Sequence, residues 1–558
     1  LDGVFNHVSD DSVYFDRYYK FLGKSEKIGA YPYWAYVYDL INDHGYGYEA
    51  AKTEAKRYFT TKYGITDFSY TEWFKINNEK CSYSDTIGDR AGKKVYSYEG
   101  WWGYDSMPVI YSTNGSEYQT GNWAEEIIYN AEGTSVTQYW IAKGSDGWRL
   151  DVANEVSNET WQRFRESVKA MNSSTVTVLG DGSTTYDDEN DAAIVGEIWS
   201  DAAYYLLGDM YDSVMNYLFR DAAAGFARTY RINRDNKYEK LDSDYTAWDA
   251  LNTLEATRER YPQEAFYAMM NLVGSHDTAR ILSYLDHVED DGWSNENMAN
   301  AYPTYAGTSQ QAKKLQYMVA LIQFTYPGAP TIYYGDEIGM VGSDDPDDRR
   351  AFEWGKGNKE LVEWYALLAQ IRNQYQALRT GSLEPFAPNR DVMGYVRRGT
   401  DGSFVIMANR LGSAQSVTVD LESLGVGSES VLTDLLTGTQ FHVSGGMVTI
   451  TVPACGGVIL KVGTAEKQTL SAEKIAALRP AYDTSYVEET QKWTVTYSWT
   501  GAPEGVKLPA SVFVKDGGAC NVDTAYTAAT VIEQKNEAGK VTGRWFFSGW
   551  SRSGRPSI

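Results

Sequence analysis

The sequence predicts an α/β protein: a (β/α)8 TIM barrel that lacks its first two β/α units, followed by an antiparallel β-sandwich domain and a small C-terminal β module. Strand and helix patterns alternate from residue 134 to about residue 376, which is typical of parallel strands joined by helical crossovers. After residue 385, period-two alternation with glycine-rich turns indicates antiparallel strands. A β pattern returns from residue 487.

Six segments have the pattern of barrel strands: 1–7, 146–152, 191–199, 211–217, 268–277 and 329–339. Helical patterns accompany them at 134–144, 159–171, 218–230, 310–324 and 359–375. A complete barrel of this kind has eight strands. Because the chain opens inside the strand pattern LDGVFNH, we expect a fragment, with two strand–helix units and any signal peptide upstream of residue 1.

Four regions are expected along the chain. The barrel covers residues 1–385 and carries a subdomain at about 8–115, because that stretch is too long for a plain loop. An antiparallel β domain follows at 386–463, then a linker at 464–484. Residues 485–558 form the last β module, which we expect to be truncated.

Composition narrows the class of partner. The formal net charge is −24, which argues against nucleic acid and anionic membrane surfaces. No apolar stretch is long enough to span a membrane, and the three cysteines have no metal-site spacing. The 44 tyrosines and 17 tryptophans fit either large aromatic cores or carbohydrate binding, because the C–H faces of sugar rings stack on aromatic rings.

Three acids stand at predicted strand ends: Asp151, Glu197 and Asp277. Cleavage of a glycosidic bond needs one ionised and one protonated carboxyl group beside an oxocarbenium-like centre. Arg149 shares a strand face with Asp151, so we expect it to keep Asp151 ionised as the nucleophile. The apolar and aromatic neighbours of Glu197 favour its protonated form. Asp277 would stabilise the developing positive charge.

Any one of these acids has an ordinary alternative role, since charged residues often end strands and cap the next helix. Taken together, the segments DGVFNH, GWRLDVANEV, VGEIW, LVGSHD and YPGAPTIYYGDEIGM resemble the ordered motifs of the α-amylase family of retaining glycoside hydrolases. The resemblance covers residues 1 to about 460. It implies Asp151 as nucleophile, Glu197 as acid/base and Asp277 as transition-state stabiliser.

The resemblance also implies the substrate-binding residues. Its expected sugar contacts at the cleavage point are His7, Arg149 and His276, with Asn6 and Asp2 in support and Asp2 more structural. Asp345 and Arg349, in DDPDDRR, would grip a sugar on the non-reducing side. Trp199 is a stacking candidate on the leaving-group side or else a packing residue, and Trp101 and Trp102 are assigned to structure.

Details of the motifs indicate which branch of the α-amylase family the sequence most resembles. Asn154 and Glu155 stand where many plain α-amylases carry Lys-His, whose histidine helps hold calcium. No cofactor is therefore required by the sequence, while Ca²⁺ stays possible. The segment WWGYDSMPVIYS is most similar to amylopullulanases. Val109 and Ile110 within it depart from the neopullulanase pattern MPKLN.

The C-terminal segment resembles the short β repeats of Gram-positive surface proteins, on WTVTYSWTGAPEGVKLP and GRWFFSGWS. This implies an extracellular protein, secreted or attached to the cell surface, with the cell wall as a possible partner. The alternative is a starch-binding module that stacks sugar on tryptophans, with the candidates Trp493, Trp499, Trp545 and Trp550.

The expected function is hydrolysis of α-1,4 bonds, with α-1,6 bonds as the second candidate linkage, in an α-glucan polysaccharide or oligosaccharide such as starch, pullulan or maltodextrin, by double displacement. Two alternatives remain at this point. One is a transglycosylase that passes the same intermediate to a sugar acceptor. The other is a glucan-binding surface protein that kept the fold and lost the chemistry.

Overall fold

The computed structural model describes residues 1–82, 94–111, 123–172, 177–178, 184–185, 192–228, 230–232, 238–240, 245–286, 307–426, 431–490, 492–495, 507, 512–515, 530–535 and 539–546. The chain divides into two compact units. The first comprises residues 1–333, 341–348 and 368–468, and the second comprises 334–340, 349–367 and 469–558.

The six predicted barrel strands are all present and parallel. They are β1 (Asp2–Gly3), β4 (Gly147–Leu150), β7 (Ala193–Gly196), β8 (Ser213–Val214), β11 (Met270–Leu272) and β12 (Ala329–Thr331). β1, β4, β7 and β8 follow one another in a single sheet, and β11 pairs with β12. A parallel bridge between Met215 and Met270 joins the two sets in chain order, as a barrel requires.

Helices lie between these strands along the chain and after the last of them. They are α3 (Val136–Ala142), α4 (Asn158–Asn172), α5 (Tyr217–Ala227), α6 (Ala247–Arg260), α7 (Gln263–Ala268), α8 (Ile281–Asp286), α10 (Gln310–Thr325), α11 (Lys359–Gln374) and α12 (Gln376–Thr380). Side-chain caps explain several starts: Ser135, Asn216, Thr246 and Ser309 each accept a main-chain N–H of the first turn.

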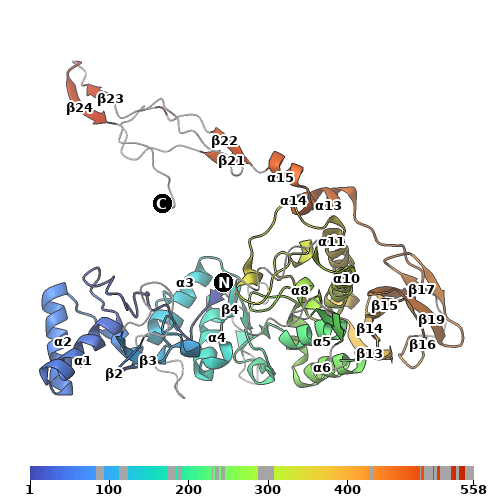
Figure 1. Ribbon diagram of the computed structural model, residues 1–558, viewed down its shortest axis with the longest axis horizontal. Coiled ribbons are helices and arrows are strands. Elements are labelled where there is room, and N and C mark those ends of the chain that lie inside the picture. The colour runs from blue at the N-terminus through green and yellow to red at the C-terminus, as the bar shows by residue number, and fades with distance from the viewer. Residues whose placement is uncertain are drawn as a thin grey trace. The chain divides into compact units, whose positions relative to one another are not determined.

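The long excursion after β1 is a small aromatic subdomain (blue in Figure 1). It contains α1 (Ala30–His44), α2 (Tyr48–Tyr63) and a hairpin of β2 (Ile76–Ser82) and β3 (Lys94–Tyr98). The buried hydroxyl of Tyr38 in α1 donates to the Ile76 carbonyl at 2.6 Å and ties the helix to the hairpin. The chain returns beside the end of β1, where the Ile110 N–H donates to the Asn6 carbonyl at 2.9 Å.

A β-sandwich follows the barrel. Its larger sheet has the order β13-β14-β15-β20-β17-β18, and β16 pairs with β19. The strands are β13 (Ser382–Asn389), β14 (Val392–Gly399), β15 (Gly402–Asn409), β16 (Gln415–Asp420), β17 (Val431–Asp434), β18 (Gln440–His442), β19 (Met447–Val452) and β20 (Gly456–Val462). Alternating apolar residues of both sheets form one core, so the predicted antiparallel domain is confirmed.

The remaining short strands form separate pairs. β5 (Thr177–Val178) pairs with β6 (Thr184–Thr185), and β9 (Tyr230–Ile232) pairs with β10 (Tyr238–Lys240). Both pairs are antiparallel, so they stand apart from the parallel barrel strands.

The second unit has its own small core, formed by Ile338, Met340 and Val362 with Phe352, Leu478, Ala481 and Tyr482. The segment expected to be a linker contributes α13 (Ala472–Ala477) and α14 (Arg479–Tyr482), and α15 (Thr484–Thr490) follows. Two hairpins come next, β21 (Lys492–Val495) with β22 (Val512–Lys515) and β23 (Val531–Lys535) with β24 (Val541–Phe546). In the described part of the chain, no helix has the length and apolar character needed to cross a membrane.

Candidate active site

Asp151 and Glu197 lie at the carboxyl ends of adjacent strands, because the sheet register continues one step beyond β4 and β7. The Asp151 N–H donates to the Gly3 carbonyl at 3.0 Å, and the Glu197 N–H donates to the Leu150 carbonyl at 2.9 Å. Arg149 precedes Asp151 by two residues and therefore points to the same face of the sheet. The predicted location of both acids is confirmed, and it is the end at which barrels carry their active sites.

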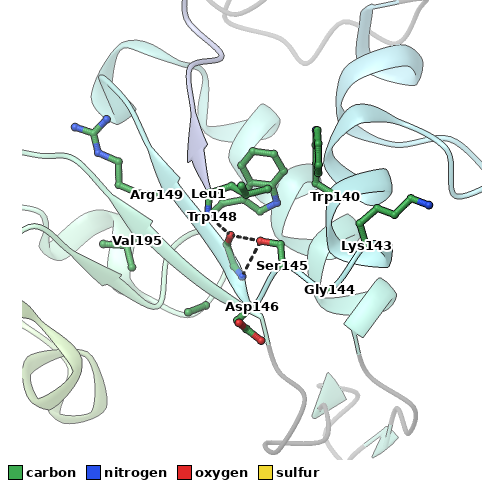
Figure 2. A pocket seen from close by; sticks show the side chains of 11 residues that line it. Leu1, Trp140, Lys143, Gly144, Ser145, Asp146, Trp148, Arg149 and Val195 are labelled. Carbon is green, nitrogen blue, oxygen red and sulfur yellow. Dashed lines mark hydrogen bonds between the residues drawn. The ribbon is translucent and has the colours of Figure 1, made fainter. Parts of the chain in front are cut away.

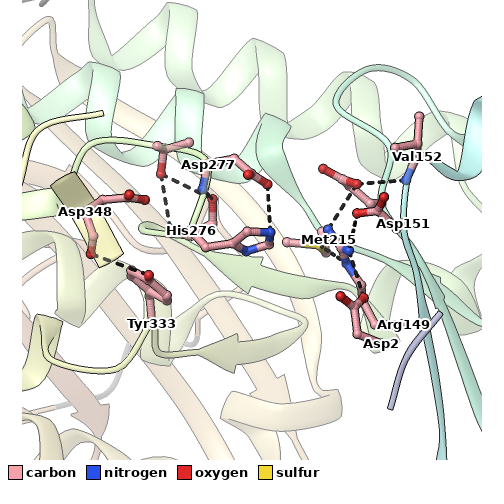
Figure 3. A network of polar contacts seen from close by, with 12 residues as sticks. Asp2, Arg149, Asp151, Val152, Met215, His276, Asp277, Tyr333 and Asp348 are labelled. Carbon is pink, nitrogen blue, oxygen red and sulfur yellow. Dashed lines mark hydrogen bonds and ion pairs between the residues drawn. The ribbon is translucent and has the colours of Figure 1, made fainter. Parts of the chain in front are cut away.

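The guanidinium of Arg149 contacts three carboxyl groups (Figure 3). Nη1 donates to Asp151 Oδ1 at 2.7 Å and to Asp2 Oδ1 at 2.9 Å. Nη2 lies 3.0 Å from Glu197 Oε2, an ion pair without hydrogen-bond geometry. Burial disfavours the cation, but Glu197, Asp2 and Asp151 outweigh burial and raise the Arg149 pKa. Arg149 is thus a fixed positive charge at the centre of the site.

The surroundings of Glu197 are more polar than the sequence indicates. Its Oε2 accepts the Val152 N–H at 2.9 Å, and its Oε1 accepts the indole N–H of Trp199 at 3.1 Å. With Arg149 beside Oε2, two donors and one cation face a side chain that is 7% exposed. These contacts replace the apolar surroundings expected from the sequence neighbours of Glu197, and its role as acid/base stays a prediction.

Several charges and burial act together on the pKa of Asp151. Burial raises the pKa of Asp151 above its usual value, and the hydrogen bond and charge of Arg149 lower it by less. Glu197 and Asp2 add to the rise through their negative charge. Burial is thus the largest cause of the raised pKa and outweighs the nearby guanidinium, and the expectation that Arg149 keeps Asp151 ionised stays a prediction.

Val152, directly after Asp151, has a strained backbone. Its φ is 45° and its ψ 46°, in the left-handed region, which is rare for a β-branched residue. This conformation turns the Val152 N–H toward Glu197 Oε2. Strain of this kind persists where surrounding contacts hold it, and it concentrates at functional sites.

His276 and Asp277 follow β11, and their side chains pair at 3.1 Å between Nε2 and Oδ2. The Asp277 N–H donates to Ser275 Oγ at 3.1 Å, and the Ser275 N–H donates to Thr278 Oγ1 at 3.1 Å. These hydrogen bonds shape the turn that presents Asp277 (Figure 3).

Tyr217 connects this turn to Glu197, and the sequence reasoning missed it. Its ring stacks on Trp199, with centroids 3.8 Å apart and planes within 10°. Its hydroxyl lies 3.3 Å from Ser275 Oγ. The charges of both Glu197 and Asp277 act on the Tyr217 hydroxyl, although burial is the main cause of its raised pKa. Tyr217 begins α5 directly after β8, which in sequence is only an aromatic residue at a strand end.

His7 and Asn6 leave the end of β1. The charge of Asp151 acts on His7, but burial dominates and lowers the pKa of His7, so its ring is neutral at pH 7. His7 pairs with Val109 in a β-bridge, and its ring stacks on Trp101 at 5.1 Å and 13°. Asn6 is 1% exposed, and within the described residues its Oδ1 has no hydrogen-bond partner.

The other expected sugar contacts are accessible. Trp199 is 48% exposed although Tyr217 covers one of its faces. Asp345 and Arg349 are both exposed, and their grip on a sugar stays a prediction. Within the described ranges, no group of three or more His, Cys, Asp or Glu side chains is placed to hold a metal ion. Calcium binding therefore stays untested.

A cavity of about 640 Å³ lies at the opposite ends of the same strands (Figure 2). Its lining includes Gly147 and Ala193, the first residues of β4 and β7, together with Trp140 and Trp148. Chemistry in barrels takes place at the carboxyl ends. This cavity is therefore distinct from the candidate active site, although Arg149 borders both.

Comparison with known proteins agrees with this geometry. The model of the alpha amylase catalytic domain matches residues 1–360, and the model of the maltogenic amylase C-terminal domain matches residues 386–459. An amylopullulanase of Thermoanaerobacter thermohydrosulfuricus is 34% identical over 526 residues, which cover 91% of this chain and 30% of that protein. Neopullulanase 2 of Thermoactinomyces vulgaris is 34% identical over 378 residues, or 65% of this chain and 54% of that protein.

Solved structures share the fold. The native debranching enzyme of Nostoc punctiforme aligns with a TM-score of 0.55 and 25% identity, over 83% of this chain and 75% of that chain. The chain spans less than a third of the length of the amylopullulanases it matches. The family resemblance of the motifs is confirmed, whereas the likeness of residues 485–558 to surface repeats stays a prediction. Because the catalytic-domain model covers more than half of the sequence, the chain belongs to the α-amylase family of glycoside hydrolases, with a TIM barrel followed by a β-sandwich.

Proposed function

We propose that the protein is a retaining α-glucan hydrolase that cleaves α-1,4 and also α-1,6 glucosidic bonds of starch, pullulan or maltodextrins. The observation that carries the proposal is the contact of one guanidinium, that of Arg149, with both Asp151 and Glu197. A planar group that touches both carboxyl groups holds them close together, as retaining enzymes require. The names of the relatives, amylopullulanase and neopullulanase, support the substrate class.

In the first step, the Asp151 carboxylate attacks the anomeric carbon while Glu197 gives its proton to the leaving glycosidic oxygen. A glycosyl ester forms on Asp151 and the glycosidic bond breaks. In the second step, Glu197 takes a proton from water, the oxygen of that water attacks the same carbon, and the ester bond breaks. Asp277 stabilises the positive charge that develops at the anomeric carbon, and the Arg149 cation stabilises the Asp151 carboxylate that leaves in the second step.

The resting contacts indicate what substrate binding must change. Glu197 accepts two N–H groups and lies beside the Arg149 cation, and burial raises the pKa of Asp151. For the first step, Glu197 has to carry a proton and Asp151 has to be ionised. A glucan that closes over Trp199 and excludes water would weaken the solvation of the Glu197 carboxylate. The Arg149 cation would then stabilise the negative charge on Asp151.

Asp151→Asn tests the mechanism, because an amide cannot form the ester. We expect kcat/KM on maltoheptaose to fall by roughly 10³-fold or more, with maltoheptaose binding retained. Asp146→Asn is the matched control, since Asp146 is an exposed residue just before the other end of β4. Appreciable turnover by Asp151→Asn would show that another group is the nucleophile.

Product analysis on pullulan tests the linkage. Maltotriose as product reports α-1,6 cleavage, and panose reports α-1,4 cleavage. Longer oligosaccharides formed at high maltotriose concentration would favour the transglycosylase alternative. No release of reducing sugar from any α-glucan would favour a binding protein without catalysis.

We also propose that the protein acts outside the cell, secreted or attached to the wall. The proposal is supported by the resemblance of residues 485–558 to surface-protein repeats. Detection of the protein in the wall or culture fluid of the source cells, against a cytosolic marker, tests it. Recovery with the cytosolic marker alone would contradict it.

A further inference from the structure

Trp102 combines high exposure with a strained backbone. Its side chain is 82% exposed, the highest value among the large apolar side chains in the described part of the chain. Its φ is 52° and its ψ 21°, a left-handed conformation that is unfavourable for a bulky residue. Burial of the ring cannot explain why the chain accepts this strain, because the ring is in solvent.

The ring of Trp102 is the outer member of an aromatic column that starts in the active site. His7 stacks on Trp101 with centroids 5.1 Å apart and planes at 13°. Trp101 stacks on Trp102 at 5.4 Å and 15°. The inner end of the column is close enough to Asp151 for that charge to act on His7. The column therefore leads from the site of cleavage to the surface.

The turn that carries Trp102 is held by hydrogen bonds. The Trp101 N–H donates to the Met107 carbonyl at 2.9 Å, and the Tyr104 N–H donates to the Trp101 carbonyl at 3.0 Å. The Tyr98 hydroxyl donates to the Asp105 carbonyl at 2.7 Å. A Cβ on Gly100 would lie 2.1 Å from the Tyr104 carbonyl oxygen, so only glycine fits there. The turn is preorganised, and a preorganised ring loses little entropy when a ligand stacks on it.

We propose that Trp102 forms a stacking subsite for a glucose ring of the bound α-glucan, away from the cleavage point along the chain of sugars. The inference rests on the proposed function and adds a specificity for longer glucans. Trp101 acts as a spacer that ties the subsite to His7. The outer face of Trp102 offers a rigid aromatic plane to the apolar C–H face of a glucose ring. This replaces the assignment of Trp102 to structure.

Calorimetry in the Asp151→Asn background tests the subsite, with maltoheptaose and maltose as probes. We expect Trp102→Ala to weaken maltoheptaose binding about tenfold, or ~1.4 kcal/mol, because an aromatic contact of this kind is removed. Maltose has only two glucose units and we expect it to bind at the cleavage point, so its affinity should change less than twofold. Trp102→Phe keeps an aromatic plane and should retain affinity within about threefold.

Trp248→Ala is the matched control, since Trp248 is 52% exposed on α6, and it should leave both affinities unchanged. The proposal is overturned if Trp102→Ala leaves maltoheptaose binding unchanged, or if it weakens both probes equally. It is also overturned if Trp102→Phe binds as weakly as Trp102→Ala. Failure of the proposed function has a different signature, namely no hydrolysis of any α-glucan by the unsubstituted protein.

Discussion

Two arginines of the first unit, one half-buried and one fully buried, are held in opposite ways. Arg149, at the strand ends of the barrel, contacts three carboxyl groups, and its pKa is raised. Arg397, in β14 of the sandwich, is fully buried and donates to main-chain carbonyls, among them those of Thr325 and Leu378 at 2.6 and 2.9 Å. Burial lowers the pKa of Arg397 to about 10.

The difference separates a cation used in chemistry from a cation used in folding. The acceptors of Arg397 include carbonyls at the ends of α10 and α12, where unpaired carbonyls and the helix dipole favour positive charge. These acceptors cannot titrate. The partners of Arg149 do titrate, and two of them are the proposed reacting groups. Removal of Arg149 should therefore lower activity and change stability in a pH-dependent way. Removal of Arg397 should lower stability equally at all pH values tested.

Arg149→Met should have the largest effect on activity. We expect kcat/KM on maltoheptaose to fall more than about 10³-fold, because Asp151 and Glu197 lose their shared counter-charge. Loss of Arg149 also removes a contribution that lowers the pKa of Asp151, so the folded variant binds protons more readily than the unfolded chain. Its stability deficit should therefore be largest at pH 8 and shrink toward pH 5. Urea unfolding at both pH values measures this, and an equal deficit at both would contradict it.

Arg397→Met should have the largest effect on stability. Its removal takes a donor from the buried Thr325 carbonyl and weakens the hydrogen bonding of the Leu378 and Gly381 carbonyls, so we expect a loss of about 3–5 kcal/mol in the free energy of unfolding. Because carbonyls do not titrate, the deficit should be the same at pH 5 and pH 8. The fraction that remains folded should hydrolyse maltoheptaose at the normal kcat. A deficit that varies with pH would remove the distinction between the two arginines.

The sequence predicts the positions of the strands, and of the charged residues at their ends, better than it predicts the contacts that those charged residues make. All six parallel strands lie within the predicted segments, because period and turn residues are local signals. Asp151 and Glu197 are found at strand ends for the same reason. The environment of Glu197 was not predictable, since it includes the N–H of Val152, whose backbone is strained, and the Arg149 cation on the neighbouring strand. Such contacts depend on sheet register and a left-handed backbone, which one sequence does not reveal.

Substitutions of Tyr217 test whether Glu197 depends on a residue that it does not contact directly. The ring of Tyr217 stacks on Trp199, and Trp199 donates a hydrogen bond to Glu197. We expect Tyr217→Leu to lower kcat about 10- to 30-fold with little change in KM, because Trp199 loses the ring that orients its N–H toward Glu197. Tyr217→Phe keeps the stack and loses only the contact with Ser275, so it should lose less than about threefold. Equal losses in both variants would assign the effect to the hydroxyl instead of the ring.

Asp16 is the anionic counterpart of Arg397, and its replacement should have the smallest effect. Asp16 is fully buried, and its carboxylate accepts the N–H groups of Lys20, at 2.7 Å, and Phe21, at 3.3 Å. Burial raises its pKa to about 6, against the effect of these hydrogen bonds. The folded state therefore binds the proton more tightly than the unfolded chain, and the cost of the charge grows as pH rises from about 4 to 6.

Asp16→Asn removes that charge and keeps Oδ1 as acceptor for both N–H groups, and the left-handed φ of 52° suits asparagine. The variant should be more stable than the unsubstituted protein by roughly 1–2 kcal/mol at pH 8. The gain should vanish near pH 4, where Asp16 is protonated. Thermal unfolding at pH 8, 6 and 4 measures the difference. A loss of stability at pH 8 would contradict this prediction. It would show that the negative charge of Asp16 stabilises the folded state.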